Sequence, residues 1–204
     1  MRSPKIRRYA VIIAMALMLV SVVVLADVIY YYKGVITAQV SAPPIVFYNG
    51  TFTYTTSTGT CTYKLNSYVP GYANFTALPT GFTATIQLTN ASYAQFYHAL
   101  GLVVNTLGWL YVTNVTTSGN EIINTLTIIV QSASTGQTVC SFTVISDSQP
   151  ITSPTTACSL SPGPYFISVL VQPNIPLYTS QSETVTLYFG YNVVSNATVP
   201  LPPT

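Results

Sequence analysis

Apolar and polar residues alternate along most of the chain, which is the period of a β-strand with one buried face. The alternation is clearest at residues 81–89, where Phe82, Ala84, Ile86 and Leu88 alternate with threonine and glutamine. Similar runs rich in β-branched and aromatic residues recur, and each is expected to be a strand. The expected strands lie at residues 45–48, 51–56, 61–66, 81–89, 109–115, 122–133, 138–146, 165–172 and 184–194.

Turn-forming residues separate most of these runs. Asn49 and Gly50 join the first two and are the pair that a type I′ turn prefers, so residues 45–56 are predicted to form a β-hairpin. Further turn signals lie at residues 134–136, 147–154, 162–164 and 173–176.

Residues 90–108 depart from the alternation and predict the only helix. Their large apolar residues fall three and four positions apart, as on one face of a helix. These residues are Tyr93, Phe96, Tyr97, Leu100, Val104 and Leu107. Asn90 or Ser92 can cap the start of this helix and Gly108 can end it.

The order of elements predicts an all-β fold class. Eight or nine short strands, with turns about ten residues apart, are typical of a single antiparallel β-sandwich or jelly roll, here with one short helix over one end or face. This domain is expected to span residues 43–204. Residues 197–204 are too rich in proline to add a central strand.

The chain opens with the features of an export signal, which we assign to residues 1–26. Four basic residues precede an apolar run at residues 10–26, and Ala26 offers a small residue for a signal peptidase. Cleavage there would leave Asp27 as the new N-terminus. The alternative is an uncleaved membrane anchor, because the run is longer than most signal peptides and shorter than most membrane spans. Both readings place the domain outside the cell.

Loss of the leader changes the charge of the protein. Two lysines and four acidic residues then remain, which gives a net charge of −2: Lys33, Lys64, Asp27, Glu121, Asp147 and Glu183. No basic patch survives, which argues against nucleic acid as a partner. Five Asn-x-Ser/Thr sequons make N-linked glycans possible on this nearly uncharged surface: Asn49, Asn74, Asn90, Asn114 and Asn196.

Three cysteines, Cys61, Cys140 and Cys158, leave one unpaired if a disulfide forms. Cys140 and Cys158 are closest in sequence and flank a turn-rich segment, so this pair is favoured over Cys61 with either partner. Export favours disulfide formation. The remaining thiol is expected to be buried and inert.

Side chains for catalysis are scarce. His98 is the only histidine and falls on the polar side of the predicted helix, and the four acids are widely separated. Motifs for zinc, phosphate or a nucleophilic serine do not occur. We therefore expect no enzymatic activity, no catalytic residue, no metal site and no cofactor. The sixteen tyrosines suit strands and subunit contacts, with a sugar-binding platform as an alternative.

Residues 27–42 form an extended segment with no turn before Pro43-Pro44 that could fold it back on the next strand. An exposed strand of this kind would aggregate, as would a sandwich that lacks an edge strand. Insertion of the segment into a neighbouring subunit would remove both defects, which is donor-strand complementation. The expected donor residues are Val28, Ile29, Tyr30, Tyr31, Tyr32, Val35, Ile36, Thr37, Ala38 and Val40. The alternative is that this segment is the first strand of its own sandwich.

The leader, the segment "ADVIYYYKGVITAQVSAPPIVF", the charge-poor threonine-rich domain and the closing "SQSETVTLYFGYNVV" together resemble archaeal bundling pilins. These are similar in turn to bacterial TasA/camelysin biofilm fibre subunits. The resemblance implies a jelly-roll subunit that polymerises head to tail into extracellular filaments, which bundle with their neighbours in a biofilm matrix. The membrane would then be a partner only during export.

Two other classes remain open. An archaeal type IV pilin would retain the apolar stretch as a helical filament core, although residues 7–13 show no small residue where a prepilin peptidase usually cuts. A membrane-anchored, glycosylated surface or sugar-binding domain is the third class. The N-terminus of the exported form distinguishes the three: Asp27 for strand donation, Tyr9 or Ala10 for the type IV pilin, and Met1 for the anchor.

Overall fold

A computed structural model describes Ile13, Met15 and residues 42–79, 81–151, 156–194 and 196–197. Residues 42–204 form one compact unit, and the fold below is that of this unit alone. The predicted leader, apart from Ile13 and Met15, lies outside the described residues, as does the donor segment up to residue 41. No helix among the described residues is long and apolar enough to cross a membrane.

The unit is an antiparallel β-sandwich, which confirms the predicted all-β class. One layer is a six-stranded sheet in which every neighbouring pair is antiparallel. Its strands, in spatial order, are β1 (Ile45–Tyr48), β7 (Ala94–Val104), β13 (Gly163–Pro173), β9 (Ile123–Ser132), β10 (Thr138–Ser146) and β11 (Gln149–Pro150).

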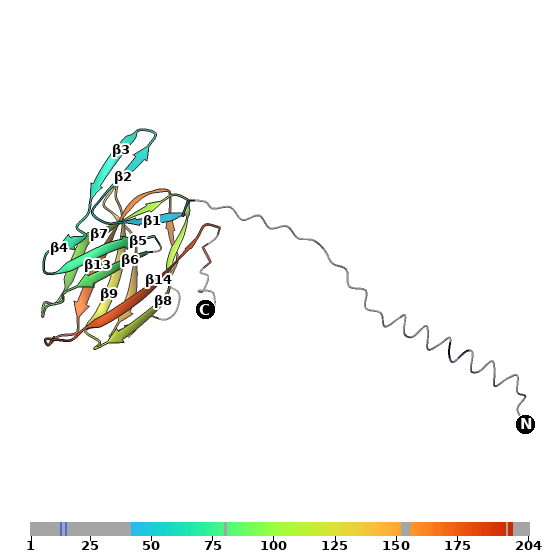
Figure 1. The fold of residues 1–204 in the computed structure, drawn as a ribbon. Helices are drawn as coiled ribbons and strands as arrows, with labels where there is room; N and C mark the ends of the chain where they lie inside the picture. The colour runs from blue at the N-terminus through green and yellow to red at the C-terminus, as the bar shows by residue number, and fades with distance from the viewer. Residues whose placement is uncertain are drawn as a thin grey trace, which may run out of the picture. The chain divides into compact units, whose positions relative to one another are not determined.

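The opposite layer consists of two separate three-stranded sheets (Figure 1). The first contains β12 (Cys158–Leu160), β8 (Gly108–Gly119) and β14 (Glu183–Asn192). The second contains β4 (Tyr68–Val69), β5 (Ala73–Leu78) and β6 (Gly81–Ile86). Because each is paired within itself only, the layer is interrupted between β14 and β6.

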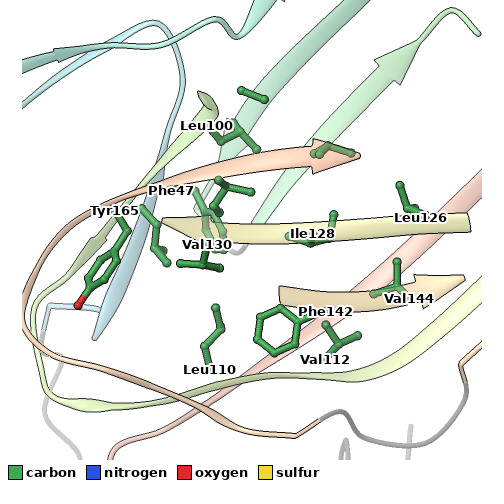
Figure 2. Packing of buried hydrophobic residues seen from close by; sticks show 14 of the residues in the cluster. Phe47, Leu100, Leu110, Val112, Leu126, Ile128, Val130, Phe142, Val144 and Tyr165 are labelled. Carbon is green, nitrogen blue, oxygen red and sulfur yellow. The ribbon is translucent and has the colours of Figure 1, made fainter. Parts of the chain in front are cut away.

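The core lies between the two layers. Figure 2 shows Leu110 and Val112 of β8 facing Val130 of β9 and Phe142 of β10, and all four side chains are buried. Alternate residues of each strand point into this space, as the period of two requires. The hydrophobic effect on these side chains is the main force that holds the layers together.

A hairpin of β2 (Thr51–Thr56) and β3 (Gly59–Lys64) packs on the outer face of the six-stranded sheet, and its tip extends beyond the neighbouring strands (Figure 1). Phe52 anchors it against Gly101 of β7, where an added Cβ would lie 2.5 Å from the ring. The ring of Phe52 stacks between Tyr48 and Tyr63, with centroid distances of 5.3 and 5.1 Å. Gly101 therefore makes room for this second, smaller core.

The predicted helix over residues 90–108 is wrong, because residues 94–104 form strand β7. A spacing of four residues places side chains on the same face of a strand as well as of a helix. Phe96, Leu100 and Val104, which have this spacing, face the main core from strand β7. Leu102 faces the same core and Val103 packs under the hairpin, so both faces of β7 are covered. Such a strand loses its polar alternation. Three residues of the supposed helical face are exposed: Tyr93, Tyr97 and Leu107.

The predicted β1–β2 hairpin is also wrong. β1 pairs with β7 in the six-stranded sheet, whereas β2 pairs with β3. A type I′ turn needs positive φ at both central residues, and only Gly50 has it, at 74°. The chain leaves the sheet at Gly50, whose N–H donates to Ser67 Oγ at 3.0 Å and whose carbonyl accepts from Leu65 N–H at 2.7 Å.

All nine predicted strands are present as β1, β2, β3, β6, β8, β9, β10, β13 and β14. The strands that the pattern missed are β4, β5, β7, β11 and β12. Three of these are only two or three residues long, and β7 was assigned to the helix. The remaining missed strand, β5, has six residues and an exposed face, whereas β13 was predicted although most of its residues are buried.

Candidate functional site

The interruption in the second layer is a cleft of about 530 Å³. β6 and β14 form its two walls, and each is paired on one side only among the described residues: β6 with β5, and β14 with β8. Their other edges both border the cleft. The N–H and C=O groups of such edges are free to pair with one further strand.

Apolar side chains line this cleft from three directions. The floor comes from the six-stranded sheet, with Leu126 and Ile128 on β9 and Val169 and Val171 on β13. The walls add alternate residues of β6 and β14, which are only partly buried although they pack against the core: Phe82, Ile86, Val185, Leu187 and Phe189. The cleft therefore lies between two strand edges and over an apolar floor.

The two ends of the cleft differ in chemistry. One end is closed by three aromatic rings, those of Phe47, Phe82 and Phe189, whose centroids lie 5.7 to 6.0 Å apart. Glu183 occupies the other end, where its Oε2 accepts a hydrogen bond from the backbone N–H of Ile123 at 2.9 Å. Its Oε1 is buried and has no hydrogen-bond partner among the described residues.

A second, shallower hollow of about 450 Å³ lies beside β4 and β7. Its three tyrosines, Tyr68, Tyr72 and Tyr97, are 46% to 68% exposed. Amide side chains of Asn66, Gln87 and Gln95 also line it. Neutral hydrogen-bonding groups and exposed aromatic rings thus lie together in this hollow.

His98 lies in β7, where its backbone has a φ of 52° and the register with β13 is shifted. Its imidazole stacks between the rings of Tyr97 and Phe166, with centroid distances of 3.7 and 3.9 Å. Burial lowers the pKa of His98, and its Nε2 is buried and has no hydrogen-bond partner in the part of the chain that the structure describes. Its backbone N–H donates to Ser168 Oγ at 3.0 Å. These contacts support a packing role for the neutral ring.

The described part of the chain contains no group of three or more His, Cys, Asp or Glu residues that could hold a metal ion. Glu121 and Asp147 are exposed, and both have a φ of 52°, as in turns.

The predicted disulfide between Cys140 and Cys158 is confirmed, with a Cα–Cα distance of 6.1 Å. It joins β10 of the six-stranded sheet to β12 of the opposite layer. The expectation of a buried third thiol is wrong, because Cys61 is exposed. Cys61 lies on β3, in the part of the β2–β3 hairpin that is not packed against the sheet.

The five sequons differ in accessibility. Four asparagines are exposed: Asn49, Asn74, Asn90 and Asn196. Asn90 is nevertheless engaged, because its Oδ1 accepts from Leu177 N–H at 2.6 Å and its Nδ2 donates to Leu177 O at 3.4 Å. Asn114 is half-buried in β8. Steric access is therefore best at Asn49, Asn74 and Asn196.

The predicted donor residues fall outside the described residues, and the structure does not test them. They are Val28, Ile29, Tyr30, Tyr31, Tyr32, Val35, Ile36, Thr37, Ala38 and Val40. Sequence reasoning also missed the cleft. The alternation in residues 81–89 and 184–194 marks two strands with one apolar face each, but it does not reveal that their edges border one gap.

A scan against protein-family models and a search of curated proteins found no match to this chain.

Proposed function

We propose that this protein is the structural subunit of an extracellular filament that polymerises by donor-strand complementation. Residues 27–40 of one subunit fill the cleft between β6 and β14 of the next. The observation that carries this proposal is the cleft itself, with two unpaired strand edges above an apolar floor. An incoming strand can pair its backbone with both edges and bury alternate side chains between them.

The dimensions of the cleft and the donor are compatible. The β14 wall runs from Glu183 to Phe189, which is about 20 Å at roughly 3.3 Å per residue. The fourteen residues of 27–40 are more than enough to span it. Each apolar side chain that becomes buried contributes about 1.5–3 kcal/mol, and each backbone hydrogen bond adds about 1 kcal/mol.

Strand donation of this kind propagates a polymer. The donor segment and the acceptor cleft are different surfaces, so the contact is head to tail and leaves one free cleft and one free donor at the ends. The low charge of the exported chain limits repulsion between subunits. The Cys140–Cys158 disulfide agrees with an oxidising location outside the cell.

Deletion of residues 27–40 tests the proposal directly. The deleted protein is expected to remain a monomer in electron micrographs and in light scattering. A synthetic peptide of residues 27–40 should bind it and raise its melting temperature, whereas a scrambled peptide of the same composition should not. Filaments that persist after the deletion would refute strand donation.

The second candidate function, sugar binding, rests on the hollow with Tyr68, Tyr72 and Tyr97. A surface domain of this class would bind neutral oligosaccharides through these rings and the neighbouring amides. Glycan-array binding that is lost in Tyr68→Ala and Tyr72→Ala, together with an exported form that starts at Met1, would favour it over the filament. A start at Tyr9 or Ala10 would instead favour the type IV pilin.

A further inference from the structure

We propose that Lys33 of the inserted segment pairs with Glu183 of the accepting subunit and thereby fixes the register and direction of the donor strand. The occupant of the cleft is then residues 27–33 of a second copy of this chain. This inference rests on the proposed function and narrows the inserted part of the donor segment from residues 27–40 to residues 27–33.

The charges in the cleft and the donor are complementary and few. Among the described residues that line the cleft, Glu183 alone is charged. In the sequence, Lys33 is the only basic residue between Arg8 and Lys64. The donor segment therefore carries two charged side chains, Asp27 and Lys33, and only Lys33 is opposite in sign to Glu183.

The environment of Glu183 leaves half of its carboxylate unpaired. Oε2 accepts a hydrogen bond from the N–H of Ile123, whereas Oε1 is buried and finds no partner among residues 42–197 as far as they are described. A buried carboxylate oxygen without a hydrogen bond is unfavourable. A lysine ammonium has three N–H donors and could satisfy Oε1 after a small rotation of the glutamate side chain.

The side-chain parity of the two strands agrees with this pair. Glu183 lies on the same face of β14 as Val185, Leu187 and Phe189, which point to the cleft. If Lys33 points to the cleft, a period of two brings Tyr31, Ile29 and Asp27 to the same face, with Asp27 at the aromatic end. Two apolar side chains then lie over the apolar floor and the ammonium lies over the carboxylate.

The same parity selects the direction of the strand. In the opposite direction, residues 35–39 would occupy the cleft and would place Thr37 over the apolar floor where the favoured direction places Ile29. With residues 27–33 in the cleft, the donor runs from the aromatic end toward Glu183. It is then antiparallel to β14 and parallel to β6, because Phe82, near the start of β6, contacts Phe189 at the aromatic end.

Cysteine cross-linking tests this register in the full chain, in a Cys61→Ser background. The pair Lys33→Cys with Glu183→Cys should give a ladder of covalent oligomers on a non-reducing gel. Two control pairs keep the same parity but shift the donor by two residues: Tyr31→Cys with Glu183→Cys, and Val35→Cys with Glu183→Cys. Both should give at most a trace of oligomer.

The outcomes separate this inference from the proposed function. A ladder from a shifted pair would overturn the Lys33 register and retain strand donation. If electron micrographs show filaments but none of the cysteine pairs gives a ladder, then Lys33 does not lie beside Glu183 and the inference is overturned. Neither filaments nor ladders from any pair, with the parent Cys61→Ser chain also monomeric, would overturn both proposals.

Charge variants supply a second readout that does not need cysteines. Filaments of Lys33→Met should release subunits at least about 30-fold faster than the parent, because the carboxylate stays buried and unpaired. Lys33→Arg should retain most of the stability. The double variant Lys33→Met with Glu183→Gln should dissociate more slowly than Lys33→Met alone, since it removes the unpaired charge. Equal release rates for Lys33→Met and the parent would refute the pair.

Discussion

At the scale of single residues, positions that break the strand pattern explain how the hairpin and the sheet fit together. His98 has a positive φ and an imidazole held between two rings, and Ser168 connects its backbone to Gln131. The hydroxyl of Ser168 donates to Gln131 Oε1 at 2.8 Å while it accepts from His98 N–H. The only histidine of the sequence is thus part of the packing.

His98 predicts a loss of stability at mildly acidic pH. Burial lowers its pKa, so the unfolded chain binds a proton more readily than the folded one. The free energy of unfolding should therefore fall as the pH drops below about 6.5 and through the lowered pKa of folded His98. It is the only histidine, so urea titrations at pH 7 and pH 5 isolate its effect.

The matched variant for this test is His98→Asn, because asparagine tolerates positive φ and does not titrate. It should lose much less stability than the parent between pH 7 and pH 5. The same loss in both proteins would show that another group causes the pH dependence.

At the scale of elements, the β2–β3 hairpin depends on a close approach to β7. Gly101→Ala would bring a methyl group to 2.5 Å from Phe52 Cε1, and that ring is held by Tyr48 and Tyr63. The substitution should lower the free energy of unfolding by about 1–3 kcal/mol, as overpacking does. Chemical denaturation measures this loss.

Phe52→Leu supplies the control for the Gly101 prediction. In that background, Gly101→Ala should cost less than it does in the parent, because the ring atoms that it meets are gone. Strictly additive losses would mean that the two side chains do not meet in the folded protein.

At the scale of the whole molecule, the unpaired edges of β6 and β14 predict where a single charge blocks assembly. Ala84 and Thr85 are neighbours on β6 and both are exposed, but only Ala84 lines the cleft. Ala84→Glu should reduce the filament mass by at least about tenfold, because strand insertion would bury an unpaired carboxylate. Thr85→Glu should assemble normally.

Both variants should keep the melting temperature of the parent when they are monomeric, since neither site is in the core. Electron microscopy and sedimentation measure assembly, and circular dichroism measures the melting temperature. Equal assembly by the two variants would contradict the use of this cleft.

The sequence by itself determined the fold class and nine of the fourteen strands that the structure describes, because runs of alternating, β-branched and aromatic residues are typical of strands. It also favoured the Cys140–Cys158 pair, which lies close along the chain. The tertiary structure decided which strands pair and which faces are covered twice. The sequence of β7 predicts a helix, but the strand is apolar on both faces because the hairpin covers the second one. Asn49-Gly50 predicts a hairpin turn, but β1 pairs with β7 and not with β2. The cleft depends on edges almost a hundred residues apart in the sequence, at residues 81–86 and 183–192, so only the folded arrangement of the sheets reveals it.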